Sequence, residues 1–171
     1  MTGLLQIRNR QRARAVNLPL LRQITRHLLA EHFHAAQFEL CIHLVAASEM
    51  ACLNETFLQH EGSTDVITFD HTEPETRNSK LETILHGEIF ISLEDAIAQA
   101  CEFGTTWQSE LTRYVIHGLL HLAGHDDLES AARKKMKRAE NQILQSIGKQ
   151  FALSQLAKPN RKSQIANRKS S

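Results

Sequence analysis

Three histidines and two aspartates lie within eleven consecutive residues of an otherwise mostly apolar segment. His117 and His121 are four residues apart, and positions with this spacing are neighbours on one face of a helix. Two imidazoles placed in this way can bind one metal ion. Gly124 predicts the end of the helix, because glycine readily adopts the left-handed conformation that follows many helix C-termini. The turn can return His125 or Asp127 to the ion, and two histidines with one further N or O ligand are typical of catalytic zinc.

The residue after the first histidine distinguishes this pattern from the common zinc-protease helix. That helix reads H-E-x-x-H, and its glutamate is the general base. The corresponding residue here is Gly118. The sequence therefore argues against peptide hydrolysis by the usual route, and a small metalloprotease is the least favoured alternative.

The helix expected around the histidine pair is apolar on nearly every side, which predicts that it lies in the core. Thr106 is its expected N-cap and Leu122 its expected last residue. Unpaired histidines are costly in such surroundings, and a metal ion would remove that cost.

Periodicity and capping residues along the chain predict about four strands and about five helices. The expected strands are at residues 4–8, 38–46, 66–69 and 84–91. The expected helices are at residues 17–31, 48–57, 92–104, 106–122 and 128–147. Strands and helices do not alternate strictly, so the pattern favours a single α+β domain with a small sheet over a doubly wound fold.

Length and composition indicate one domain and no membrane segment. The 171 residues are 42% hydrophobic and 23% charged, which is enough for one substantial core. No apolar run approaches the roughly 20 residues that span a bilayer. Gln6 and Arg8 interrupt the apolar start, and the three cysteines lack the spacing of a metal site. A cytoplasmic protein with reduced thiols is therefore expected.

Charge is distributed unevenly along the chain. Residues 1–30 contain six arginines and no acidic residue, and residues 149–171 contain six lysines and arginines and no acidic residue. Residues 31–148 hold all nineteen acidic residues and only eight basic ones. Basic ends on an acidic body indicate contact with a polyanion, although solvated tails are often basic as well.

The end of the chain differs in composition from the rest. We expect one metal-binding domain at residues 1–148 and a basic, disordered tail at residues 149–171. A further basic cluster in the last expected helix is either a solvated face or part of an RNA surface. Its members are Arg133, Lys134, Lys135, Lys137 and Arg138.

The eleven residues that begin at His117 read H-G-L-L-H-L-A-G-H-D-D. They resemble the H-G-x-L-H-L-x-G-Y-D-H signature of the YbeY family, bacterial metal-dependent endoribonucleases. Residues 63–69 (S-T-D-V-I-T-F) are similar to the family's P-T-D-V-L-S-F segment, and residues 87–92 (G-E-I-F-I-S) to its G-D-I-x-I-S strand. The resemblance covers roughly residues 38–148.

The resemblance implies a mixed four-stranded sheet beneath a metal cleft and one zinc ion per chain. It also implies cleavage of single-stranded RNA in ribosomal RNA maturation and ribosome quality control, with ribosomal RNA and the small ribosomal subunit as partners. A zinc ion would lower the pKa of a bound water and polarise the scissile phosphate. No residue is assigned as general base or as a substrate contact.

Two positions of the signature itself depart from the family. Asp127 stands where the family has its last histidine, and His125 stands where it has a tyrosine. Carboxylate oxygen is an accepted zinc ligand, and three residues beyond Gly124 give the chain enough reach to return to the helix. The predicted metal ligands are therefore His117, His121 and Asp127.

A third departure concerns the substrate. Residues 53–57 are similar to the family's L-N-x-x-Y/F segment, which an arginine follows in the family; this chain has Leu58. Because that arginine is implied to engage RNA, Leu58 favours an alternative, a non-catalytic ribosome-associated factor with a structural zinc.

The sequence predicts a role or a position for four other polar residues. Asp126 is a candidate to orient a ligand histidine, and Glu88 is a candidate for the same cleft. His43 and His60 stand alone in the sequence and are expected at the surface.

Overall fold

The structure is a computed structural model that describes residues 2–73 and 83–158. Its strands are β1 (Thr2–Asn9), β2 (Ala35–Val45), β3 (Val66–Asp70) and β4 (Thr83–Ser92). Its α-helices are α1 (Leu18–His27), α2 (Ala47–Leu53), α4 (Leu93–Phe103), α5 (Trp107–Leu122) and α6 (Ser130–Gln150). Three shorter helical turns are η1 (Leu28–His32), η2 (Asn54–Leu58) and η3 (Leu153–Leu156).

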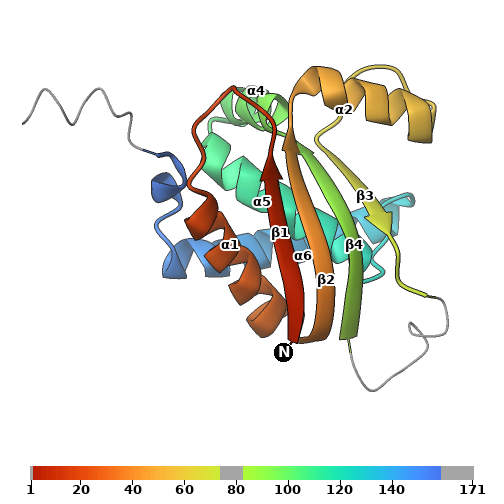
Figure 1. Ribbon diagram of the computed structural model, residues 1–171, viewed down its shortest axis with the longest axis vertical. Coiled ribbons are helices and arrows are strands. Elements are labelled where there is room, and N and C mark those ends of the chain that lie inside the picture. Colours follow the sequence, from red (N-terminus) through yellow and green to blue (C-terminus); the bar gives the residue numbers. More distant parts are fainter. Residues whose placement is uncertain (1, 74–82, 159–171) are drawn as a thin grey trace, which may run out of the picture.

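The four strands form one mixed sheet in the order β1-β2-β4-β3. β1, β2 and β4 run parallel, and β3 pairs antiparallel with β4. Helices α1, α5 and α6 lie behind the sheet in the view of Figure 1. The predicted α+β domain, with a four-stranded mixed sheet and five α-helices in the described part of the chain, is confirmed.

The strand register places the main core on the face that the helices cover. Ile7, Ile42 and Ile89 are aligned across β1, β2 and β4, and all three are buried. Helix α5 packs over β3 and β4 and has ten buried residues, which agrees with a helix that is apolar on most sides. No helix in the described ranges is both long and apolar enough to cross a bilayer.

Gly118 is the point at which α5 comes closest to the sheet. A Cβ atom on this residue would lie 2.5 Å from Cγ2 of Ile89, whose side chain is fully buried. The close approach therefore requires glycine. It also shows that position 118, where the zinc-protease helix carries its glutamate, faces the sheet.

The ordered chain continues beyond residue 148. Helix α6 ends at Gln150, and Leu156 of η3 is fully buried. The backbone oxygen of Leu156 accepts a hydrogen bond from the nitrogen of Asn17 at 2.8 Å. The boundary expected at residue 148 thus lies inside α6, and residues 159–171 of the expected tail lie outside the described residues.

Among residues 2–73 and 83–158, a small hydrophobic cluster covers one end of the opposite face of the sheet. Met50 of α2 packs there against Phe90 in a small second cluster. His43 is only 3% exposed and stacks on Phe90, with 4.2 Å between the ring centroids. The prediction of a surface position for His43 was wrong, because Phe90 of the neighbouring strand β4 stacks on its ring. His60, in contrast, is exposed as expected.

Substitution of Gly118 by alanine tests the contact between α5 and the sheet. The gain in helix propensity is about 1 kcal/mol, whereas overpacking of a core costs about 1–3 kcal/mol. Because Ile89 is branched at Cβ and buried, we expect overpacking to dominate and the free energy of unfolding to fall by about 1–2 kcal/mol. Urea unfolding of the metal-free protein measures this change.

Gly148→Ala is the matched control for this measurement. A Cβ on Gly148 of α6 meets no atom within 4 Å, so only the propensity gain applies and the stability should rise. Equal or higher stability of Gly118→Ala would contradict the inferred close approach.

Candidate metal centre and the adjoining cavity

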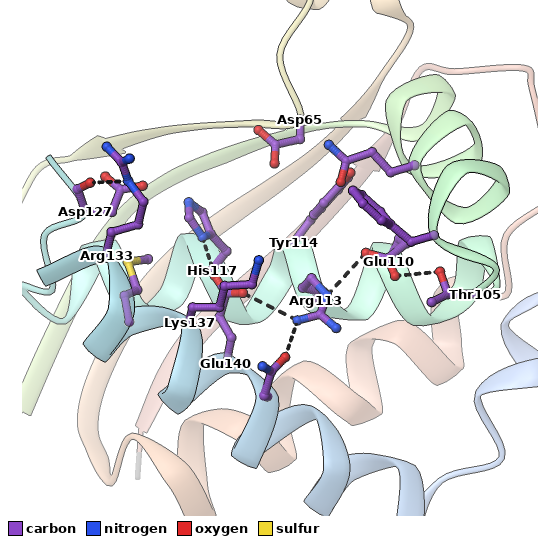
Figure 2. A pocket seen from close by; sticks show the side chains of 14 residues that line it. Asp65, Thr105, Glu110, Arg113, Tyr114, His117, Asp127, Arg133, Lys137 and Glu140 are labelled. Atoms are coloured by element: carbon purple, nitrogen blue, oxygen red, sulfur yellow. Dashed lines mark hydrogen bonds and ion pairs between the residues drawn. The ribbon is translucent and has the colours of Figure 1, made fainter. Parts of the chain in front are cut away.

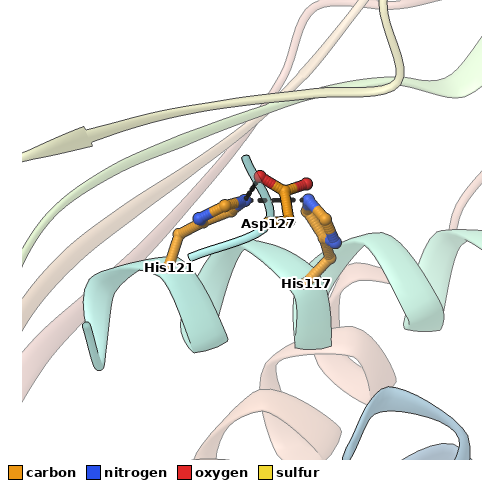
Figure 3. Close-up of side chains that lie close together, drawn as sticks. All are labelled: His117, His121 and Asp127. Atoms are coloured by element: carbon orange, nitrogen blue, oxygen red, sulfur yellow. Dashed lines mark hydrogen bonds and ion pairs between the residues drawn. The ribbon is translucent and has the colours of Figure 1, made fainter. Parts of the chain in front are cut away.

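The last two turns of α5 bring two imidazoles together with a carboxylate. The Nε2 atoms of His117 and His121 are 3.0 Å apart. A carboxylate oxygen of Asp127 lies 3.9 Å from Nε2 of His121, and the three potential ligand atoms are all within 4.8 Å of one another. Figure 3 shows the two rings and the carboxylate converging on one point above the helix.

The loop after α5 returns Asp127 by a turn at glycine. Gly124 has φ +85°, in the left-handed region, and its nitrogen donates to the oxygen of His121 at 2.9 Å. The nitrogen of His125 donates to the oxygen of Leu120, also at 2.9 Å. These bonds reverse the chain, so that Asp127 faces the histidine pair while the ring of His125 does not join the group.

Each histidine in the pair has its other ring nitrogen engaged. Nδ1 of His117 lies 2.6 Å from Oε1 of Glu140, and Nδ1 of His121 lies 3.1 Å from the backbone oxygen of His125. Both partners are acceptors, so each Nδ1 carries a proton and each neutral ring has its lone pair on Nε2. Two lone pairs 3.0 Å apart repel unless a proton or a metal ion lies between them. Two ligands of tetrahedral zinc at 2.0–2.1 Å are separated by roughly 3.3 Å, so these residues fit a metal ion.

Glu140 comes from α6 and is supported by further charged residues (Figure 2). Nη1 of Arg113 lies 3.6 Å from Oε2 of Glu140 and donates to Asn141 at 2.7 Å. Nε of Arg113 donates to Glu110 at 3.2 Å, and Thr105 donates to the other oxygen of Glu110 at 2.7 Å. Both glutamates are buried, and the arginine between them offsets the cost of burying their charges.

Sequence reasoning missed Glu140. Its signal was an acidic residue on the inward stripe of the last helix, four residues after Met136 and three before Ile143. An acid at such a position needs a buried partner. The partner is 23 residues away along the chain, so the spacing within α6 does not identify it.

The two histidines have pKa values shifted in opposite directions. Burial lowers the pKa of His117, but the hydrogen bond and negative charge of Glu140 outweigh it, with support from Asp65 and Asp127, so this pKa is raised. The pKa of His121 is lowered by burial and then by the positive charge of His117, which Asp127 only partly opposes. In the metal-free protein His117 therefore binds a second ring proton more readily than His121 does.

A cavity of about 340 Å³ adjoins the cluster, bounded by α4, α5 and α6. His117, Asp127 and Glu140 line it together with the cations Arg113, Arg133 and Lys137. Arg133 donates to the backbone oxygens of Asp127 and Leu128, at 3.0 and 3.3 Å, and so holds the returning loop. Of the basic cluster predicted in the last helix, Arg133 and Lys137 thus line the cavity and the other three members do not.

Comparisons with known proteins identify the family of this chain. A family profile described as Endoribonuclease YbeY matches residues 6–148. The chain belongs to the YbeY family. Endoribonuclease YbeY from Salinibacter ruber is 38% identical over 96 residues, which are 56% of this chain and 61% of that protein. The chain thus aligns with less than two thirds of that relative's length.

Two further proteins extend the coverage of the YbeY match. Endoribonuclease YbeY from Desulfitobacterium hafniense is 35% identical over 125 residues, 71% of this chain and 78% of that protein. A solution structure from Thermotoga maritima has a TM-score of 0.62 at 24% identity, and covers 92% of this chain and 98% of that one. The latter supports the fold alone.

The remaining polar residues singled out from the sequence do not join the group of His117, His121 and Asp127. Glu88 lies on the opposite face of the sheet, 3.2 Å from His43, so its assignment to the metal cleft was wrong. Strand alternation explains this, because Ile89 points to the helices. Asp126 accepts a hydrogen bond from the nitrogen of Leu128 at 2.9 Å and stabilises the loop instead of orienting a histidine. Leu58, at the family's arginine position, is 48% exposed on η2.

Glu140→Gln tests the origin of the raised His117 pKa. The substitution removes the negative charge, so burial should then lower this pKa below the ordinary histidine value. The raised pKa of His117 stabilises the folded protein fully below the unfolded pKa of about 6.5. This stabilisation is lost as the pH rises through the folded-state pKa. Histidine NMR titration of the metal-free protein measures the shift.

Glu102→Gln removes the same charge from an exposed position on α4 and serves as the control. It should leave the His117 titration unchanged. An identical His117 pKa in Glu140→Gln and in the unsubstituted protein would rule out the assigned cause.

Proposed function

We propose that this chain is a zinc-dependent endoribonuclease that hydrolyses single-stranded RNA during ribosomal RNA maturation. The observation that carries the proposal is the convergence of two histidine Nε2 atoms and a carboxylate at the edge of a cavity lined by cations. The endoribonuclease activity for which the YbeY relatives are named supports the reaction class. A ribosomal RNA substrate places the protein in the cytoplasm, with the small ribosomal subunit as its partner.

The proposed ligands are His117, His121 and Asp127, with one zinc ion per chain. Such an ion supplies a Lewis acid beside the phosphodiester and a means of activating water at neutral pH. Glu140 and the backbone oxygen of His125 hold the two rings in the tautomer that presents Nε2, as the outer partners of metal-bound histidines do in general.

The overall reaction adds water across one P–O bond of the RNA. The oxygen of water bonds to phosphorus, and the leaving ribose oxygen takes a proton. The side chains of His117, His121 and Asp127 are 21%, 29% and 36% exposed, so a backbone phosphate can reach them. Lys137 at the adjoining cavity offers positive charge for a neighbouring phosphate, which is the sequence-independent part of nucleic-acid affinity.

A second candidate function is a ribosome-associated factor that does not cleave RNA and keeps the zinc for stability. The specific observation in its favour is Leu58, which places an exposed apolar side chain where the family has an arginine. The two functions differ in a single measurable property, because only the nuclease releases RNA fragments.

The proposed function is tested by an assay of purified protein with its zinc content determined. We expect about one zinc per chain and cleavage of single-stranded RNA in preference to duplex RNA, with no cleavage of casein. The His117→Ala, His121→Ala double variant should lose both the metal and the cleavage. Full metal occupancy in the double variant would refute the site, and full occupancy of the native protein without cleavage would favour the non-catalytic factor.

The third ligand is tested separately, because the loop after α5 contains both His125 and Asp127. His125→Ala should keep its zinc, since its backbone oxygen remains, whereas Asp127→Ala should lose most of it. Asp127→His should retain zinc, and the loss of one negative charge should lower the pKa of a bound water further. The alkaline-rising limb of its pH–rate profile should then move to lower pH.

Zinc content after dialysis against a weak chelator measures the first two effects, and cleavage rates across pH measure the third. An empty His125→Ala together with a full Asp127→Ala would reverse the assignment.

A further inference from the structure

The cavity extends well beyond the ligand cluster. Figure 2 shows Asp127 and Arg133 at one end and Thr105 at the other, with His117 and Tyr114 between them. Phe103, two residues before Thr105, is also part of the lining. The space of about 340 Å³ falls within the range of small-ligand sites, roughly 300–1,000 Å³. It is therefore large enough for a ligand and is not explained by the metal ligands alone.

Two aromatic residues at the cavity have properties that suit a planar ligand. Phe103 is 63% exposed at the end of α4, so its ring is open to a partner. Tyr114 is 2% exposed, and its Oη has no hydrogen-bond partner among the described residues. A buried hydroxyl without a partner is unusual in a folded protein and is satisfied when a ligand supplies the partner.

The cations at the cavity divide into engaged and free groups. Arg113 is held by two glutamates and an asparagine, and Arg133 donates to two loop carbonyls. Lys137 makes no hydrogen bond or ion pair with any residue in the described ranges, although it lines the same cavity. An ammonium group left free in this way is available to an anion.

We propose that this cavity is a subsite for one unpaired nucleotide of the RNA, with its base stacked on Phe103 and hydrogen-bonded to the hydroxyl of Tyr114, and with its phosphate beside Lys137. The assignment rests on the proposed nuclease function and specifies which part of the substrate lies next to the cleaved bond. Single-stranded RNA is recognised in general by splayed bases stacked on aromatic rings and by backbone phosphates on cations. A base still paired in a duplex does not enter a recess of this size.

Binding of a short oligonucleotide tests the subsite independently of turnover. The probe is a fluorescein-labelled single-stranded 2′-O-methyl pentanucleotide, titrated with the zinc-loaded protein and followed by fluorescence anisotropy. Gel analysis after each titration verifies that the probe is intact. Stacking on an aromatic residue is worth enough that Phe103→Ala should weaken binding roughly 5- to 100-fold. Phe103→Trp, which keeps a π-face, should retain the affinity.

Tyr114→Phe isolates the unpartnered hydroxyl. Loss of one neutral hydrogen bond should weaken binding of the probe by roughly 2- to 10-fold. The stability of the free protein should not fall, because the hydroxyl makes no hydrogen bond there. A loss of stability with unchanged affinity would show an internal role for the hydroxyl and count against the subsite.

Salt dependence isolates the phosphate contact. Lys137→Ala should reduce the slope of log K against log salt concentration by about 0.7, the value for one contact to a single strand. Phe103→Ala should leave the slope unchanged. Lys135→Ala removes the same charge from α6 at an exposed position that does not line the cavity, and should also leave it unchanged.

The outcomes separate this inference from the proposed function. Unchanged affinity in Phe103→Ala together with an unchanged slope in Lys137→Ala overturns the subsite, even if the protein cleaves RNA. Absence of cleavage by the native protein overturns the nuclease, while the anisotropy measurements still decide whether the cavity takes a nucleotide.

Discussion

The close contact of Gly118 with Ile89 determines which side of α5 faces the solvent. Successive helical residues are rotated by about 100°, so His117 and His121 both lie on the same flank of the helix, between the sheet and the surface. The contact that holds the helix in the core therefore also delivers both imidazoles to its edge. It directs position 118 into the sheet, so a carboxylate beside the first histidine would be buried against Ile89 instead of facing the substrate. The absence of the zinc-protease glutamate thus has a packing reason.

The second requirement is the pairing of α5 with α6. The histidine pair supplies Nε2 atoms to one point only if each Nδ1 has an acceptor, and Glu140 provides the acceptor for His117. A buried glutamate is costly on its own, and Arg113 offsets this cost by lying between Glu140 and Glu110. The site therefore depends on residues that a motif of eleven positions does not contain. Helix α6 is part of the candidate metal centre even though it contributes no predicted ligand.

Much of this arrangement was accessible from the sequence, because the strongest signals are local. The histidine spacing, the glycine turn and the apolar period are properties of single elements, and the structure brings together the predicted group of His117, His121 and Asp127. Contacts between elements were not accessible. The pairing of Glu140 with His117 depends on how α5 and α6 cross, and the burial of His43 depends on its stacking on Phe90 of the neighbouring strand. The face of Glu88 was predictable from alternation within β4. Its neighbour Ile89 is apolar and faces the helices, so Glu88 lies on the other face.

The cavity retains positive charge although position 58, an arginine in the family, is leucine in this chain. Asp65, Glu110, Asp127 and Glu140 all line the cavity, so most of its cations are needed to balance acids or to hold the loop. A guanidinium suits this role because its planar donors can bond several acceptors at once. Arg113 and Arg133 each bond two acceptors in this way. Lys137 has a single flexible ammonium group, which makes no hydrogen bond or ion pair within the described residues. The arginines thus support the surrounding structure, and the ammonium group of Lys137 on α6 is left available to an anion.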